Sequence, residues 1–369
     1  MKKYKYVHLL WQGNAHFNKI VVDLISDTDN GFNVDEHLFV TPYKHIYNEI
    51  NTCANVIFEQ EIKPQSAELV NKYADKADWI FLHGMTGISE ALKIKSKNRR
   101  KIIWRTWGHD VDGYQYKTGD FLKNAVKRFL NWRWRREVRS FKLVGGSNIV
   151  DQISIRNKFG NIKAVSINYP TKNNLKTLEN AKNKTKAERK NIKVLVGHSG
   201  IDTDNHFEVI DRIKKFCGEE VSFIFVLSYG DDKYIDKVKE YIVENCSQCS
   251  ELLLSPLSKE DYTNILADVD IAILDGKKSY ALSNVAMLVY LEKKIFLNRD
   301  GILAQAFNKE GVPFCYTDEI DQMTFEEFSK KIDYSNVKET SLAPIPYEKA
   351  VERWKKILDA LNTMKRKQK

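Results

Sequence analysis

The residues best suited to bind an anion stand between a predicted strand and a predicted helix in the second half of the chain. Residues 192–196 form a short apolar run typical of a buried strand, and apolar residues recur at helical spacing from Asn205 onward. The turn between them, residues 197–200 (GHSG), leads into capping residue types at 202–204. Backbone N–H groups and a helix dipole at such a turn can bind a phosphate. An ordinary α/β connection is the alternative, because the turn matches neither GxGxxG nor a P-loop.

A second candidate site lies in the first half of the chain. Residues 102–107 predict a strand that runs into His109 and Asp110, and residues 79–82 predict one that ends at His83. In open parallel sheets, ligands bind off the carboxyl ends of the strands. Asp110, with His109 beside it, is therefore a candidate general base acting on a hydroxyl. An Asp just past a strand is also a common helix cap or turn former, so both interpretations stay open.

Residues 121–142 form a predicted helix that combines Lys and Arg with aromatic residues and carries Glu137 as its only acid. Apolar residues at 122, 126, 129, 130 and 134 share one helix face. Such a helix is typical of an element that docks on anionic headgroups. The alternative is a surface helix with its apolar face in the core; nucleic-acid binding is less favoured, because no known motif accompanies the patch. The predicted membrane contacts are Lys127, Arg128, Trp132, Arg133, Trp134, Arg135 and Arg136.

Length and composition limit the class of protein. A chain of 369 residues suits two domains, and 43% apolar residues with 17 Gly and 7 Pro describe a globular protein. No run is apolar enough to span a bilayer and no signal-peptide pattern is present, so we expect a cytoplasmic protein. The net charge of +10 calls for an anionic partner, either nucleic acid, an acidic membrane or phosphorylated small molecules. Cys246 and Cys249 form a single CxxC pair, which is weak evidence for a zinc site or redox chemistry. The favoured interpretation is two reduced cysteines at the end of a helix.

Strand-like and helix-like segments alternate in both halves, which predicts α/β domains with mainly parallel sheets. We expect strands at residues 5–10, 36–40, 55–58, 79–83, 102–107, 142–144, 164–167, 192–196, 221–227, 252–254, 269–274 and 294–297. Residues 171–190 are polar and charged, which is typical of a linker. This gives an N-terminal Rossmann-like domain at 1–170, a C-terminal one at 191–345 and an amphipathic helix with a basic tail at 346–369. Two such domains facing an interdomain cleft, with the last helix closing the pair, form the GT-B layout.

Six short stretches, in this order, resemble the bacterial 4-alpha-L-fucosyltransferase family, glycosyltransferase family 56. They are residues 83–84, 104 with 107–110, 196–199 through 205–206, 227–230 with 234–235, 281–284 and 294–299. The resemblance implies a GT-B enzyme that is peripheral on the inner face of the bacterial plasma membrane. It would transfer a deoxy-amino sugar from a dTDP- or UDP-linked donor to a polyprenyl-diphosphate-linked saccharide in surface polysaccharide assembly. His198 and Asp204 depart from the Asn that the family pattern favours at both positions, which leaves the donor sugar and base open.

The resemblance also implies roles for single residues. It places Gly197, Ser199, Asn205, His206, Tyr229 and Gly230 on the donor side, and Asp110 toward the acceptor. We add further donor-binding candidates from the strand-end loops, namely Gly200, Lys277, Lys278, Ser283 and Asn284. The acceptor-side candidates are His83, Gly84 and Trp107.

For the chemistry, we expect the amides of residues 197–200, with Ser199 and a lysine at 277 or 278, to bind the donor diphosphate. We expect no cofactor and no metal, because Asp231 and Asp232 favour a helix start over a metal motif. Two other classes stay open. A nucleotide-sugar epimerase can share this fold, and a non-catalytic protein could use the basic helix to bind membrane or nucleic acid.

Overall fold

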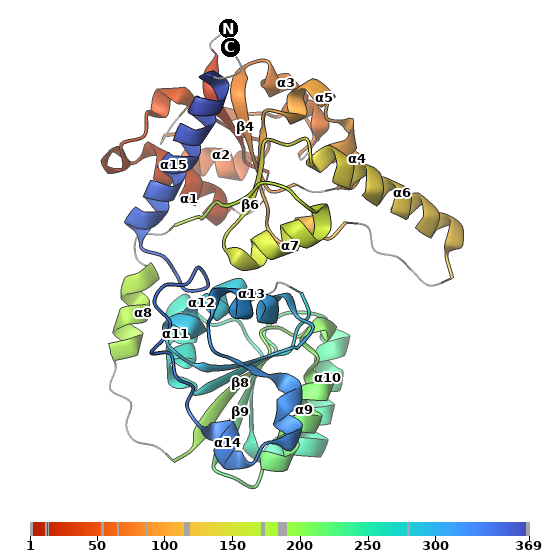
Figure 1. Ribbon diagram of the computed structural model, residues 1–369, viewed down its shortest axis with the longest axis vertical. Coiled ribbons are helices and arrows are strands. Elements are labelled where there is room, and N and C mark those ends of the chain that lie inside the picture. The colour runs from red at the N-terminus through yellow and green to blue at the C-terminus, as the bar shows by residue number, and fades with distance from the viewer. Residues whose placement is uncertain are drawn as a thin grey trace. The chain divides into compact units, whose positions relative to one another are not determined.

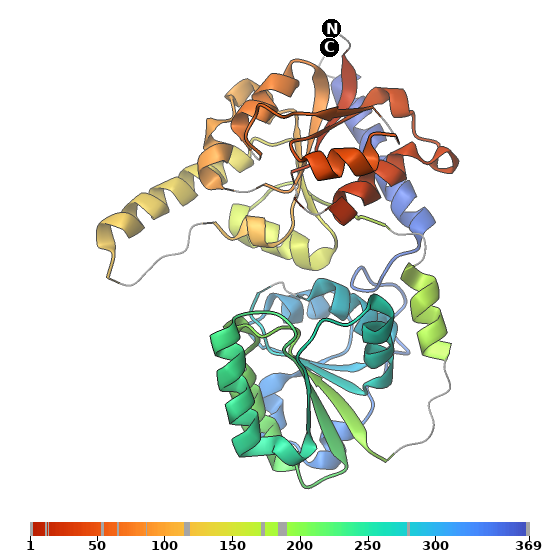
Figure 2. The ribbon, with the colours of Figure 1, turned by 180° about the vertical axis from the view of Figure 1, so that it is seen from behind.

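Two all-parallel sheets, each covered by helices, make up the chain, as the computed structural model shows (Figures 1 and 2). The structure describes residues 3–366 except 12, 14, 53–54, 65, 86, 114–118, 171–173, 184–189 and 279–280. One sheet belongs to unit 1, which comprises Met1–Thr171 and Pro346–Lys369. The other belongs to unit 2, which comprises Lys172–Ile345. The α/β fold class predicted from the sequence is confirmed.

Unit 1 contains a seven-stranded sheet in the order β3-β2-β1-β4-β5-β6-β7. Its strands are β1 (Tyr4–Leu9), β2 (His37–Thr41), β3 (Val56–Phe58), β4 (Ala77–His83), β5 (Ile102–Arg105), β6 (Leu143–Gly146) and β7 (Ala164–Ser166). Its helices are α1 (Ala15–Ser26), α2 (Lys44–Ile50), α3 (Ala67–Ala74), α4 (Ile88–Lys93), α5 (Ser96–Arg99), α6 (Phe121–Val138), α7 (Ile149–Phe159) and α15 (Tyr347–Arg366). Every strand pair is parallel.

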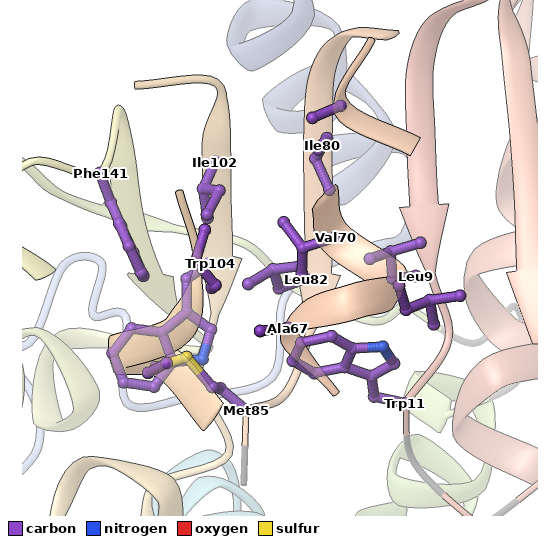
Figure 3. Packing of buried hydrophobic residues seen from close by; sticks show 14 of the residues in the cluster. Leu9, Trp11, Ala67, Val70, Ile80, Leu82, Met85, Ile102, Trp104 and Phe141 are labelled. Atoms are coloured by element: carbon purple, nitrogen blue, oxygen red, sulfur yellow. The ribbon is translucent and has the colours of Figure 1, made fainter. Parts of the chain in front are cut away.

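The two faces of the unit 1 sheet bury different sets of side chains, because successive residues of a strand point to opposite sides. Val7 and Leu9 of β1 lie in one core with residues of α3, α6 and α7; Figure 3 shows part of it around Trp104. Tyr6 lies in the opposite core with residues of α1, α2 and α15. The last helix is thus an integral part of unit 1, with Trp354 fully buried against the sheet.

Unit 2 contains a six-stranded sheet in the order β10-β9-β8-β11-β12-β13. Its strands are β8 (Ile192–Val196), β9 (Val221–Val226), β10 (Ser250–Leu253), β11 (Ile271–Leu274), β12 (Lys294–Leu297) and β13 (Cys315–Tyr316). Its helices are α8 (Asn174–Asn183), α9 (His206–Ile213), α10 (Asp232–Cys246), α11 (Lys259–Asp268), α12 (Leu282–Tyr290), α13 (Ile302–Glu310) and α14 (Phe325–Ser329). All strand pairs here are parallel as well.

The stretch 171–190 differs from its expected linker character, because it contains α8. Leu178 and Ala181 of this helix are buried, and α8 packs against α11. Two apolar positions on one face are enough to fix a short helix on a neighbour, although the surrounding composition is polar. Cys246 is the last residue of α10 and Cys249 ends the 3-10 turn that follows, and both are buried. In the part of the chain that the structure describes, every helix is too short or too polar to cross a membrane.

Candidate functional site

Each sheet has one place where the strand order reverses, which is where open parallel sheets bind ligands. In unit 1 the reversal falls between β1 and β4, and in unit 2 it falls between β8 and β11. Among the residues that the sequence predicts to be functional, the loops after β4, β8 and β11 contain Gly84, Gly197, Ser199, Gly200, Asn205, Lys277 and Lys278.

In unit 2, the turn after β8 donates all four of its backbone N–H groups within the unit. The Gly197 N–H bonds the Ile273 carbonyl at 3.0 Å, and the Gly200 N–H bonds the Tyr229 carbonyl at 2.7 Å. The N–H groups of His198 and Ser199 both donate to Oδ2 of Asp204, each at 3.0 Å. The expectation that these amides hold a diphosphate is therefore wrong for this conformation, because a buried carboxylate already occupies the place of the anion.

Asp204 holds the turn through its side chain as well as through the amides. Its Oδ1 lies 2.8 Å from Nδ1 of His198, and its Oδ2 accepts the Ser199 hydroxyl at 3.2 Å. Burial raises the pKa of this carboxyl, but the hydrogen bonds and charge from His198 outweigh burial and keep the pKa below its usual value. The turn is thus organised around an ionised Asp, a role that the sequence interpretation missed.

Asn205 and His206 serve mainly to join elements inside unit 2. Asn205 adopts a left-handed conformation with φ of 54° and donates its amide to the Asp275 carbonyl at 2.8 Å. His206 is fully buried, with Nδ1 3.2 Å from the Tyr234 hydroxyl, and burial lowers its pKa to about 4. A Cβ at Gly197 would lie 2.6 Å from Nε2 of His206, so glycine is required there. The predicted donor contact of His206 is wrong, because its ring has no exposed surface.

The start of α12 has the features of an anion site that the turn after β8 lacks. Ala281 precedes the helix with φ of 56°, in the left-handed region that an alanine adopts only under strain, and it makes no side-chain cap. The first N–H groups of a helix have no acceptor within the helix, and the helix dipole adds positive potential there. Lys277 is exposed just before this start, Ser283 is exposed on it, and both lie at the β8/β11 reversal.

Asn284 and Lys278 flank the same helix start. The Asn284 amide donates to the Tyr262 hydroxyl at 2.9 Å, which ties α12 to α11, and Lys278 is half-buried. The structure therefore brings together four of the predicted donor residues, namely Lys277, Lys278, Ser283 and Asn284. Residues 279–280 between them lie outside the described residues.

Tyr229 and Gly230 follow β9, next to the turn after β8. Gly230 pairs with Gly200 in a short parallel bridge, and a Cβ at Gly230 would lie 2.2 Å from the Gly200 carbonyl oxygen. The Tyr229 side chain is 58% exposed. The neighbouring Asp231 accepts the Tyr234 N–H at 2.9 Å as the cap of α10, so the predicted helix start is confirmed.

In unit 1, Asp110 ties together two strand-end loops. Its Oδ1 accepts the Trp107 N–H at 2.7 Å, and its Oδ2 accepts the Met85 N–H at 3.1 Å and the Trp104 indole N–H at 3.2 Å. Three hydrogen bonds to one carboxylate favour the cap interpretation of Asp110 over the general base. His109 lies in a short 3-10 turn, His109–Val111, but its side chain is outside the described residues.

His83 is part of a buried row of rings that the sequence interpretation did not find. Its Nε2 lies 3.0 Å from Nδ1 of His8, and Nε2 of His8 lies 2.9 Å from Nδ1 of His37. At the other end, Nδ1 of His83 lies 2.5 Å from the Tyr169 hydroxyl. Burial lowers the pKa of His37 and of His83 to about 3, and that of His8 well below its usual value. His83 is buried beneath Tyr169, so it cannot contact an acceptor directly.

Trp107 is half-buried and lies next to Tyr169, the residue at the end of this row. Its ring stacks on Tyr169 with centroids 5.2 Å apart, and the Arg105 guanidinium lies 4.4 Å from both ring centres. Gly84 donates its N–H to the Arg105 carbonyl at 2.9 Å and has φ of 90°, which suits glycine. Arg105 and Tyr169 were not predicted; their aromatic and cationic side chains directly at strand ends are the signal that could have found them.

Helix α6 exposes apolar and cationic side chains together. Phe121 is 80% exposed and Trp132 is 55% exposed, and Leu122, Val126 and Phe129 are exposed as well. The apolar positions of the expected core face therefore point to solvent over most of the helix. Trp134 differs, because it is buried against Trp104 and Phe159. Its predicted membrane contact is wrong.

The predicted cations of α6 differ in exposure. Arg128, Arg135 and Arg136 are exposed, while Lys127 and Arg133 are half-buried. Arg136 and Arg133 pair with Glu137 at 3.1 and 4.0 Å, and Glu137 also pairs with Arg99. The ion pairs orient the C-terminal turns of α6, where the helix joins the core.

Two Rossmann-like units in one chain are the layout of GT-B glycosyltransferases, and known structures share this fold. A glycosyltransferase from Rickettsia africae ESF-5 superposes with a TM-score of 0.58 at 14% identity, covering 100% of this chain and 97% of that one. Anabaena Alr3699/HepE, solved with UDP and glucose, gives a TM-score of 0.59 at 13% identity over 97% and 99% of the two chains. A putative UDP-N-acetylglucosamine 2-epimerase from Listeria monocytogenes gives 0.54 at 10% identity over 99% and 97%.

Residues 4–362 match the family described as 4-alpha-L-fucosyltransferase glycosyl transferase group 56. The chain belongs to this family, and it is a glycosyltransferase of the GT-B class. The resemblance and the fold predicted from the sequence are thereby confirmed.

Proposed function

We propose that this enzyme transfers a sugar from a nucleoside-diphosphate donor to a lipid-linked saccharide at an anionic membrane surface. The observation that carries the donor half is the start of α12, where the N-cap residue Ala281 makes no side-chain cap, with Lys277 and Lys278 before it, at the strand reversal of unit 2. Glycosyl transfer from such a donor leaves a diphosphate whose negative charge grows, and a helix N-terminus with two cations stabilises that charge. Alr3699/HepE, which shares the fold, was solved with UDP, which supports a nucleotide donor.

The acceptor half of the proposal rests on α6. A helix with exposed aromatic rings beside Lys and Arg binds anionic lipid through apolar burial and charge attraction. A polyprenyl-diphosphate acceptor is itself anchored in such a surface, so α6 would bring the enzyme to its acceptor. A deoxy-amino sugar as donor group and assembly of a bacterial surface polysaccharide are consistent with membership of family 56.

Thermal shift with a ligand panel tests the donor half. Ligands that bind only the folded protein raise its Tm by mass action. We expect UDP or dTDP to raise the Tm of the wild type, and the double variant Lys277→Ala/Lys278→Ala to lose most of that shift. Lys239→Ala, a change of the same type on the outside of α10, should keep it. A Tm that no nucleoside diphosphate moves would contradict the proposed donor class.

The epimerase alternative is favoured by one finding, the likeness to the putative 2-epimerase. An epimerase converts a nucleotide sugar with no acceptor present. Product analysis of UDP-sugars incubated with the enzyme alone therefore separates the two functions, and we expect no acceptor-independent conversion.

A further inference from the structure

Residues 93–101 (KIKSKNRRK) form a strongly basic stretch at the surface of unit 1. They cover the end of α4, the helix α5 and the approach to β5, and they contain only Lys and Arg among their charged residues. The exposed cations of this stretch are Lys93, Lys95, Lys97 and Arg100. Glu90 lies 2.6 Å from Lys93, and the exposed Asp75 lies 3.6 Å from Lys97. Two such pairs leave an excess of positive charge on this surface and contribute little to stability.

A buried carboxylate joins the basic stretch to α6. Glu137, in the last turn of α6, pairs with Arg99 of α5. The same carboxylate pairs with Arg136 at 3.1 Å and with Arg133 at 4.0 Å. Helices α4 and α6 also share the core around Trp104, on the face of the sheet opposite to α1, α2 and α15. The basic stretch and the C-terminal half of α6 therefore adjoin each other on one face of unit 1.

One side of α6 changes from apolar to cationic along its length. Leu122, Val126, Phe129, Arg133 and Arg136 recur at intervals of four, three, four and three residues, which places them in one row along the helix. The three apolar side chains of this row are exposed, and its two arginines are the ones that pair with Glu137. The apolar side of the N-terminal half is thus the side that meets the basic stretch in the C-terminal half.

The N-terminal half of α6 extends beyond the core of unit 1. With 18 residues the helix is about 27 Å long, whereas β5 and β6, which it connects, have four residues each and are about 13 Å long. The buried residues of α6 are Asn131, Trp134, Glu137 and Val138, in its second half. Figures 1 and 2 show the first half projecting from the rest of unit 1. A projecting helix with an exposed apolar side suits a partner that covers that side.

We propose that the basic stretch and the cationic end of this row lie on the anionic headgroups of a bilayer, while Leu122, Val126 and Phe129 enter the boundary between headgroups and acyl chains. The inference rests on the proposed function, because it needs α6 at a membrane. It adds a second contact and assigns the face of unit 1 that is turned to the lipid. Apolar burial and the attraction of Lys and Arg to anionic lipid act together at such a surface. A second copy of the chain fits this surface less well, because two surfaces with the same excess charge repel each other.

Vesicle partitioning of the full chain tests the basic stretch. Each Lys or Arg near an anionic surface contributes about fivefold to the partition coefficient. The variant Lys95→Gln/Lys97→Gln/Arg100→Gln should therefore bind phosphatidylglycerol-containing vesicles roughly a hundredfold more weakly than wild type, with a smaller dependence on salt.

A matched control removes the same charge from the opposite face of unit 1. Lys44→Gln/Lys355→Gln/Lys356→Gln changes three exposed lysines of α2 and α15. It should retain the partitioning of wild type. Both triple variants should keep the wild-type Tm, because all six side chains are exposed.

The outcomes separate this surface from the proposed function. Wild type that binds the vesicles together with a basic-stretch variant that binds them equally well overturns the surface and leaves docking by α6 standing. If that variant instead loses binding to a single-stranded RNA, the surface belongs to nucleic acid, which overturns the proposal as well. Equal loss of vesicle binding in both triple variants also overturns it, because net charge alone would then set the affinity. Wild type that does not bind anionic vesicles overturns the membrane half of the proposed function itself.

Discussion

The Asp204 carboxylate accepts both the backbone N–H and the hydroxyl of Ser199, at 3.0 and 3.2 Å. An internal carboxylate therefore occupies the position at which a phosphate was expected to bind the turn after β8. The turn acts as a preformed support for the strand reversal, and the proposed anion site of unit 2 is the start of α12.

Asp204→Ala should destabilise the protein by about 3 kcal/mol, because it removes the buried carboxylate that pairs with the His198 ring and accepts the N–H groups of residues 198 and 199. Chemical denaturation at neutral pH measures this loss. Because the folded-state pKa of Asp204 is lowered, its contribution is present above the unfolded pKa of about 3.9 and is lost as the pH falls further. Asp202→Ala, on an exposed neighbour, is the control. Tighter pyrophosphate binding by Asp204→Ala would instead show that the turn is a phosphate site that Asp204 blocks.

Asp110→Asn should lower the Tm and the transfer rate together. An amide in place of the carboxylate turns an N–H group toward at least one of the donors from Met85, Trp104 and Trp107. Thermal unfolding and initial rates on the same preparation give the comparison. An unchanged Tm with a rate loss of about a hundredfold or more would identify Asp110 as the general base and contradict its structural role.

The row of His37, His8 and His83 should make the protein sensitive to acid. These rings are buried in the neutral form with lowered pKa values, so the unfolded state binds more protons once the pH falls below about 6.5. The free energy of unfolding should decline from there toward pH 3. His8→Phe should give a shallower decline than wild type, whereas His45→Gln, at an exposed histidine, should not. Equal slopes for wild type and His8→Phe would refute the assignment.

The exposed face of α6 should bind anionic vesicles. We expect wild type to sediment with phosphatidylglycerol-containing vesicles and much less with pure phosphatidylcholine, and high salt to weaken the binding. The triple variant Phe121→Ser/Leu122→Ser/Phe129→Ser should lose most of it, since these side chains are exposed and support no core. Ile57→Ser, at an exposed residue of β3, is the matched control. Vesicle binding that survives the triple variant would exclude α6 as the docking element.

The sequence predicts this fold well where strands are short apolar runs: residues 192–196 and 294–297 are β8 and β12 as expected. It fails for α8, whose two buried positions are hidden in a polar stretch. It also fails for the role of Asp204. The carboxylate accepts hydrogen bonds from the N–H groups of His198 and Ser199, and the loop sequence alone does not show that these groups have an acceptor. The histidine row could not be predicted from the sequence either, because His8, His37 and His83 belong to three strands that become neighbours only in the folded sheet.

The central claim is sugar transfer from a nucleoside diphosphate to a lipid-linked acceptor, and a two-phase radiolabel assay measures it. The full chain is incubated with UDP- or dTDP-linked labelled deoxy-amino sugar and vesicles that contain a polyprenyl-diphosphate-linked saccharide. We predict that label enters the organic phase only when enzyme, donor and acceptor are all present. Donor that is consumed equally well without acceptor, with no label in the lipid, would contradict the claim.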